Sequence, residues 1–229
     1  MQVMLLTFLF IAMTLVSYLV MNVVYVKYYK AFLIPILTAT TAIILILIFA
    51  KVPYETYMLG GKWIDLLLGP AIVALAIPLY KQQDLLKKNL LPIVGGVSAG
   101  VLVGMISGVL FAKVVGFTEV FVLTLLPKSI TSPIAIQISS TLGGIPSLAP
   151  VFVMIAGFTG VIFGPAFMQR MRIHTATGRG IGLGTAAHAL GTSKAIELGE
   201  QEASMSSVAM TLCAIVGSFV APIMAWIFY

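Results

Sequence analysis

The chain has 229 residues, of which 60% are hydrophobic and 9% are charged, and its mean hydropathy is +1.12. Soluble domains carry about a quarter charged residues, so the composition excludes a soluble globular protein and predicts an all-α polytopic membrane protein in a lipid bilayer. The net charge of +6 comes mostly from basic residues in short connections between apolar runs, which membrane topology explains better than nucleic acid binding.

Eight apolar runs follow one another along the chain, and each predicts a helix that crosses or enters the membrane. A membrane-crossing helix needs about 20 apolar residues. The first run has neither an Arg/Lys-rich leader nor a small-residue cleavage site, so we expect a retained helix rather than a cleaved signal. The predicted runs are residues 3–26, 31–50, 64–80, 90–112, 118–143, 146–168, 180–199 and 203–228.

Three of these runs contain residues that interrupt helices. Proline lacks an amide donor and clashes with the preceding turn, so a helix kinks or breaks there. We therefore expect discontinuous helices in runs 64–80, 118–143 and 180–199. The predicted break residues are Gly69, Pro70, Pro78, Pro127, Pro133, Gly143, Gly144, Gly184 and Gly191.

A weak internal repeat relates the two halves of the chain at an offset of 115 residues. Residues 33–35 align with 148–150, and residues 68–75 align with 183–190, the two longer segments sharing a Leu-Gly-x-Ala-x-x-Ala-Leu pattern. Transporters are commonly built from such repeats. We therefore predict two repeats, residues 1–115 and 116–229, within one membrane domain; chance similarity between Leu/Ala/Gly-rich helices is the alternative.

Basic residues predict that the repeat is inverted. They cluster at residues 27–30, 81–88 and 170–179, and connections rich in Lys and Arg tend to stay cytoplasmic. If all three clusters face the cytoplasm, the second and sixth runs have opposite directions. Residues 114–145 would then enter and leave by one face as a re-entrant pair of half-helices. The alternative is one ordinary broken span there, with eight crossings and a parallel repeat.

The first candidate site surrounds the break in residues 127–133, where one cation and three hydroxyls gather: Lys128, Ser129, Thr131 and Ser132. Amides exposed at a half-helix N-terminus, here opening at Pro133, attract an anion, and Lys128 adds a full charge. The segment therefore predicts a site for a small carboxylate. Alternatively, Lys128 extends to the membrane surface and the hydroxyls satisfy freed backbone groups.

The second candidate site lies in residues 179–200, which are rich in glycine and carry ionisable groups. Such a segment is tolerated in a bilayer only inside protein or beside a watery cavity. Thr185, His188 and Thr192 share one helical face, where His188 could bind substrate or accept a co-transported proton; a histidine satisfied by neighbouring carbonyls is the alternative. Lys194 and Glu197, spaced to pair, complete the candidate substrate-binding set.

Other functions find less support in the sequence. His174 and His188 are the only histidines and Cys213 is the only cysteine, so we expect no metal, no other cofactor and no disulfide. No nucleophile–base pair or dinucleotide fingerprint is present, so we expect no enzyme. The main alternative to a transporter is a helix-packing protein. In such a protein the glycines at 96, 100, 104 and 108 would form a helix-packing surface, used either between copies in a homo-oligomer or within the chain.

The chain resembles the LrgB/CidB family of antiholin-like, murein-hydrolase-regulating membrane proteins, whose plant relative is the plastidial glycolate/glycerate translocator. Three motifs carry the resemblance, and together they extend over essentially the whole chain. They are residues 68–80 (LGPAIVALAIPLY), residues 126–133 (LPKSITSP) with 143–146 (GGIP), and residues 179–200 continuing to 209–210.

The resemblance implies a multi-pass protein of the bacterial inner membrane. It implies a role in autolysis and cell death and in the movement of small monocarboxylates such as pyruvate or glycolate. It also implies a smaller LrgA/CidA-type partner, expected as a separate chain because the plant relative fuses both parts and this chain ends with the LrgB-like one. Ala187 and Ala189 stand where relatives often have Ser and Gly, and Ala203 where Gly is common. These departures put the substrate contacts beside His188 in question.

Overall fold

The computed structural model describes residues 2–28, 33–74 and 76–229, and these contain helices and no strand. An all-α fold is therefore confirmed. The chain forms two compact units, Met1–Ala71 and Ile72–Tyr229. Each unit is described below by itself.

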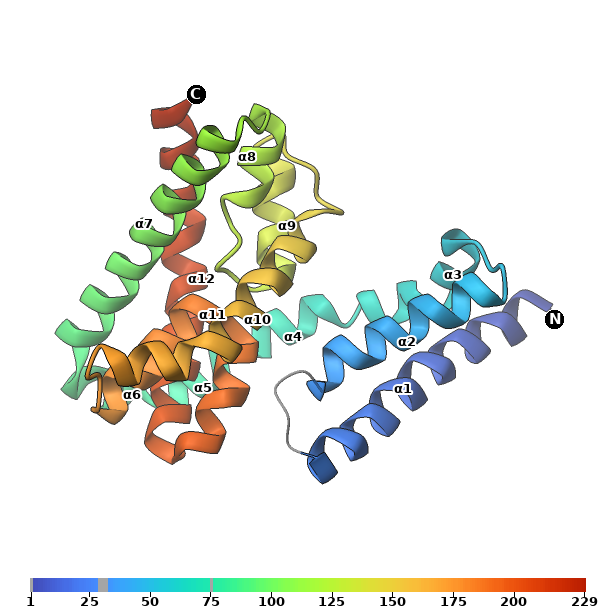
Figure 1. The fold of residues 1–229 in the computed structure, drawn as a ribbon, viewed down its shortest axis with the longest axis horizontal. Helices are drawn as coiled ribbons and strands as arrows, with labels where there is room; N and C mark the ends of the chain where they lie inside the picture. The colour runs from blue at the N-terminus through green and yellow to red at the C-terminus, as the bar shows by residue number, and fades with distance from the viewer. Residues whose placement is uncertain (1, 29–32, 75) are drawn as a thin grey trace. The chain divides into compact units, whose positions relative to one another are not determined.

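The first unit consists mainly of three helices: α1 (Gln2–Tyr28), α2 (Pro35–Phe49) and α3 (Tyr54–Asp65). Helix α1 packs against both of the others (Figure 1). The Tyr57 hydroxyl lies 3.0 Å from that of Thr14, and Gly60 lets α3 approach the Phe10 side chain. The apolar runs did not predict α3, because charged residues interrupt its sequence; its contacts with α1 stabilise it instead.

The predicted run 64–80 is divided into two short helices, α4 (Leu68–Ala74) and α5 (Ala76–Lys81), while residue 75 lies outside the described residues. The turn at residues 66–67 precedes α4. Gly69, Pro70 and Pro78 all lie within the first turns of these helices rather than at the breaks themselves. Proline is tolerated in a first turn, where its missing amide has no intrahelical acceptor.

The second unit contains the remaining helices. They are α6 (Gln83–Lys88), α7 (Leu90–Val115), α8 (Glu119–Leu125), α9 (Ser132–Thr141), α10 (Ala149–Arg170), α11 (Ala176–Leu198) and α12 (Glu200–Phe228). Helix α12 packs against α5, α7, α9 and α11 (Figure 1). Its buried Met205 and Val208 join Val97 and Val101 of α7 in the main hydrophobic core. The core thus holds the polar helix α11 beside the strongly apolar helices α7 and α12.

Four of the described helices are long and apolar enough to cross a membrane: α1, α7, α10 and α12, with α2 a shorter apolar helix. Large apolar side chains such as Leu91, Phe163 and Trp226 are exposed, at 87%, 65% and 83%. Soluble proteins avoid so extensive an apolar surface, so these side chains suit contact with lipid. The inverted repeat and the division at residue 115 stay predictions.

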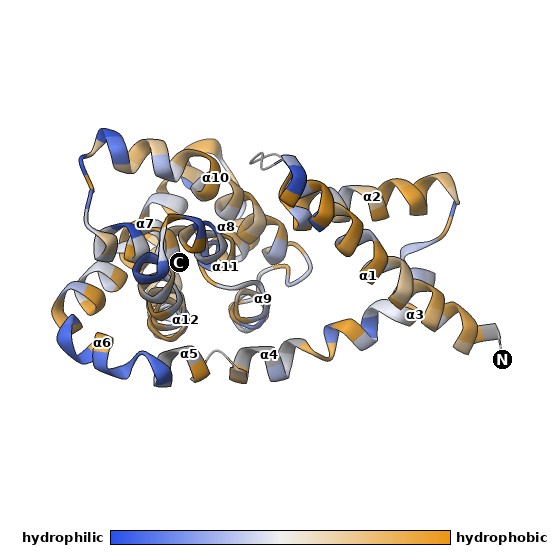
Figure 2. Ribbon diagram, turned by 90° about the horizontal axis from the view of Figure 1, so that it is seen from below, coloured by the Kyte–Doolittle hydropathy of each residue, from blue (hydrophilic) through white to orange (hydrophobic). Residues whose placement is uncertain are grey.

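The basic segments of the second unit gather at one end. Figure 2 shows hydrophilic residues concentrated in α6 and in the connection between α10 and α11. Asn89 and Pro92, directly after α6, line the same cavity as Ile173 and Thr175 of that connection. The clusters at residues 81–88 and 170–179 therefore lie at the same end, as a shared cytoplasmic face requires.

Candidate functional site at two helix breaks

The first break separates α8 from α9 and confirms the prediction for residues 127–133. Residues 126–131 are non-helical, with Pro127 near their start and Pro133 in the first turn of α9. Beyond α9, Gly143 has φ +80°, and Gly144 lies in a space too small for any side chain. The amide of Ile145 donates to the Thr124 hydroxyl over 2.7 Å, which fixes this second turn against α8.

Polar groups at the first break are left without protein partners. Within the described chain, the backbone amides of Ser129, Thr131 and Ser132 donate no hydrogen bond. The Thr131 hydroxyl is buried and equally unpartnered, although Thr131 occupies the N-cap position of α9. Buried polar groups normally find partners. Several donors here are therefore available to a ligand.

Lys128 extends into the protein rather than toward the membrane surface. Its ammonium donates to the carbonyl oxygen of Gly104 on α7, and its side chain is only partly exposed. This contact favours the binding-site interpretation over the alternative in which Lys128 extends to the membrane surface. The residue that follows the first proline of the break thus places a positive charge against α7.

The second break lies in α11, at His188. This residue has φ 44° and ψ −128°, far from helical values, in a region that favours glycine. A side chain at Gly191 would overlap the Leu183 carbonyl, although eight residues of straight helix span about 12 Å. The two halves of α11 therefore fold back on each other at His188.

Two predicted break residues of α11 have another role. Gly184 and Gly191 are not the break points that the sequence suggested; they permit close packing, Gly184 on the Ser206 backbone of α12 and Gly191 on the first half of α11. Helices tolerate glycine at a cost of about 1 kcal/mol, so glycine alone does not interrupt them. Close approach of two backbones explains these two residues.

The break also separates three residues that the sequence placed on one face. The Thr185 methyl contacts Gly100 of α7. The His188 Nε2 lies 2.9 Å from the Val153 carbonyl oxygen of α10, and the Thr192 hydroxyl lies 3.0 Å from that of Ser206 on α12. The prediction of a single face is therefore wrong, because it assumed that α11 is continuous through His188.

The glycine ridge of α7, defined as Gly96, Gly100, Gly104 and Gly108, contacts both the first break and the first half of α11. Along it, Ile181 and Thr185 of α11 lie on the first two glycines, and Ser129 and Lys128 lie on the last two. Successive ridge positions are about 6 Å apart. The ridge therefore serves internal packing. The spacing of the glycines alone had left open whether they pack within the chain or between copies.

Cys213, which the sequence did not suggest for the site, lies at the same junction. Its thiol is 3.5 Å from the Ser129 carbonyl oxygen and 3.8 Å from that of Thr185. The Thr185 hydroxyl is buried without a partner. The first break and the first half of α11 therefore approach each other at α7 and α12, and each carries an unpartnered buried hydroxyl.

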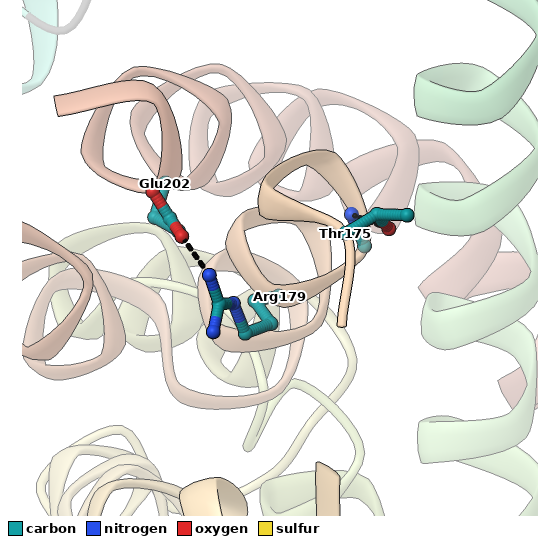
Figure 3. Close-up of polar contacts among 4 residues, drawn as sticks. Thr175, Arg179 and Glu202 are labelled. Carbon is teal, nitrogen blue, oxygen red and sulfur yellow. Dashed lines mark hydrogen bonds and ion pairs between the residues drawn. The ribbon is translucent and has the colours of Figure 1, made fainter. Parts of the chain in front are cut away.

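Two ion pairs complete the polar groups of α11. Arg179 pairs with the buried Glu202 of α12, while Thr175 caps the first turn of α11 through the Gly178 amide (Figure 3). Lys194 pairs with Glu197 three residues along, as the spacing suggested, and both side chains stay partly exposed. The first pair ties the beginnings of α11 and α12 together.

A cavity of about 540 Å³ opens beside the beginning of α11. Its lining includes Asn89 of the α6–α7 junction and Thr175 and Thr177 of α11, together with Gly96 and Ile181. Gly96 and Ile181 are the ridge contact next to Gly100 and Thr185. The cavity therefore ends one helical turn from Thr185, at the end of the unit where the basic segments gather.

The backbone at His188 gives a prediction on stability. His188→Ala and His188→Gly both lose the imidazole contact with Val153, but only glycine adopts φ 44° without strain. We expect the glycine variant to be the more stable by about 1 kcal/mol, because strain of about 1–3 kcal/mol exceeds the entropic cost of glycine. Melting temperatures of the purified variants measure this, and equal values would contradict a strained backbone.

These features define an all-α membrane protein whose polar residues gather where helices are interrupted. The chain belongs to the LrgB-like family, whose model matches residues 14–227. The resemblance seen in the sequence motifs is thereby confirmed.

Three relatives illustrate the match. The chain is 55% identical to "Uncharacterized protein YxaC" of Bacillus subtilis, over 96% of this chain and 95% of that one. It is 38% identical to "Uncharacterized protein YwbG" of the same organism, over 92% and 93%. It is 35% identical to "Holin-like protein CidB" of Staphylococcus epidermidis, over 96% of both chains. No solved structure matches the chain.

Proposed function

We propose that the protein transports a small monocarboxylate, such as pyruvate or glycolate, across the bacterial cell membrane. The observation that carries this proposal is that the first break and Thr185 of α11 lie along one ridge of α7, with Lys128 bound to Gly104 and the buried hydroxyls of Thr131 and Thr185 left unpartnered. Burying a polar group without a hydrogen bond costs about 1–3 kcal/mol. A ligand that pairs with these groups explains why the fold keeps them.

The chemistry of the site suits a carboxylate that carries one further polar oxygen. The free amides of Ser129 and Ser132 and the N-terminus of α9 would donate to the carboxylate, and the Lys128 ammonium would balance its charge. The Thr185 hydroxyl, on the first half of α11, would bind the keto or hydroxyl oxygen. No catalytic residue is part of this proposal.

His188 suits the coupling of transport to protons. A carbonyl oxygen only accepts, so Nε2 donates to Val153, and the neutral ring then keeps Nδ1 as an acceptor. A proton taken up at Nδ1 would charge the ring inside the protein, at the point where α11 folds back. Proton movement and the conformation of α11 would thereby be linked.

Uptake by proteoliposomes tests the proposal. We expect labelled pyruvate or glycolate to accumulate faster in vesicles holding the protein, with or without a co-reconstituted LrgA/CidA-type subunit, than in protein-free vesicles. Labelled alanine, which carries an added ammonium, serves as the control solute. Equal carboxylate flux across both membranes, with the partner subunit present, would remove the proposal.

A second candidate function is an antiholin-like modulator of pore assembly, murein hydrolase activity and autolysis. The printed name of the Staphylococcus relatives, "Holin-like protein CidB", favours it. This role needs an outward packing surface for a small partner subunit or a second copy. Co-purification with the LrgA/CidA-type subunit, together with a change in its dye release from vesicles, would support it.

A further inference from the structure

The Lys128 ammonium contacts the glycine ridge of α7 at one place, between Gly104 and Gly108. The ammonium donates to the Gly104 carbonyl oxygen, which also accepts from the Ser107 hydroxyl over 3.2 Å. In an α-helix each carbonyl points toward the amide four residues on. A third donor to Gly104 therefore has to approach over residue 108.

Gly108 leaves the space that this approach requires. A Cβ at position 108 would lie 2.8 Å from the Lys128 Nζ and 3.4 Å from its Cε. The first distance is closer than such atoms pack, so the ammonium would have to move. Because it ends a flexible side chain, it can move without shifting either helix.

We propose that Gly108 is a positioning residue that holds the Lys128 ammonium on the Gly104 carbonyl, at the rim of the anion site. The unpartnered, buried hydroxyl of Thr185, two turns back along the same ridge, is an independent sign that the ridge faces a ligand. The expected effect on anion binding rests on the proposed function. The position of the ammonium on the Gly104 carbonyl does not.

The same helix supplies a matched control. At Gly95, outside the ridge, a Cβ would meet nothing within 4 Å. Gly95→Ala therefore makes the same chemical change as Gly108→Ala and leaves the ammonium in place.

Two measurements on the full-length protein test the proposal. The first is the rate at which methyl acetimidate modifies Lys128, followed by mass spectrometry with the exposed Lys62 as an internal reference. The second is uptake of labelled pyruvate. We expect Gly108→Ala to increase Lys128 modification severalfold and to raise KM about tenfold with little change in maximal rate, since a weakened ground-state contact acts on binding. The Gly95→Ala control should match the wild type.

The outcomes separate this proposal from the proposed function. If the wild type transports pyruvate but Gly108→Ala matches the Gly95→Ala control in modification or in KM, the positioning role is wrong and transport stands. If no form of the protein transports, the function is wrong, and modification alone then decides whether Gly108 seats the ammonium. A merely structural role would lower the melting temperature and maximal rate instead, and that result would also overturn the proposal.

Discussion

Lys128→Ala is expected to remove most of the uptake of labelled pyruvate or glycolate by proteoliposomes. The ammonium, bound to the Gly104 carbonyl oxygen, is the full positive charge of the first break. A charge-assisted contact is worth about 1.5–3 kcal/mol, so its loss weakens anion binding by about tenfold to a hundredfold. Bound anion would then occupy a site with no balancing charge, which slows each later step of transport.

The matched change is Lys62→Ala, which removes the same side chain from an exposed position of α3. We expect it to leave uptake and melting temperature unaltered, and Lys128→Ala to leave the melting temperature close to that of the wild type. Lys128→Arg should keep part of the activity, since the charge remains while its shape changes. Undiminished uptake by Lys128→Ala would show that the anion binds elsewhere.

Gly184→Ala is expected to give a large loss of stability. A methyl group there would overlap the Ser206 carbonyl of α12. A backbone carbonyl cannot rotate away, so α11 and α12 would have to separate and the contacts around Gly180 would loosen with them. Overpacking of this kind costs about 1–3 kcal/mol, measured as a fall in the melting temperature of the purified protein.

Gly182→Ala, two residues away on α11, provides the comparison. A methyl group there would lie 3.8 Å from the Met168 sulfur, an ordinary contact with a flexible side chain. Alanine also favours a helix over glycine by about 1 kcal/mol, so we expect this variant to be as stable as the wild type or more so. If both variants melt at one temperature, the close packing of α11 on α12 is not what holds the unit together.

The local sequence predicted most of the helices and one of the two breaks. Apolar runs of sufficient length located the long helices, because burial in lipid depends on composition along a single helix. The break between α8 and α9 followed from Pro127 and Pro133, whose missing amides and fixed φ act within one turn. Helix α3 was missed, since its stability comes from α1 rather than from its own hydropathy.

The second break shows where local reasoning stops. Glycine suggested breaks at 184 and 191, yet the chain turns at His188, which adopts φ 44°. Glycine permits either a break or a close contact, and only the neighbouring backbone decides which. Ser206 on α12 and Leu183 on the first half of α11 occupy those places, and tertiary packing brings each of them there.

The sequence by itself determined the class of protein, the family, and the residues with chemistry to offer, because composition, length of apolar runs and proline effects act locally. Only the tertiary structure decided which of those residues meet. Lys128 and Thr185 are 57 positions apart in the sequence, and both lie on the glycine ridge of α7, two turns from each other, where the absence of side chains lets α11 and the turn between α8 and α9 pack closely. That approach is a property of packing, which no single segment contains.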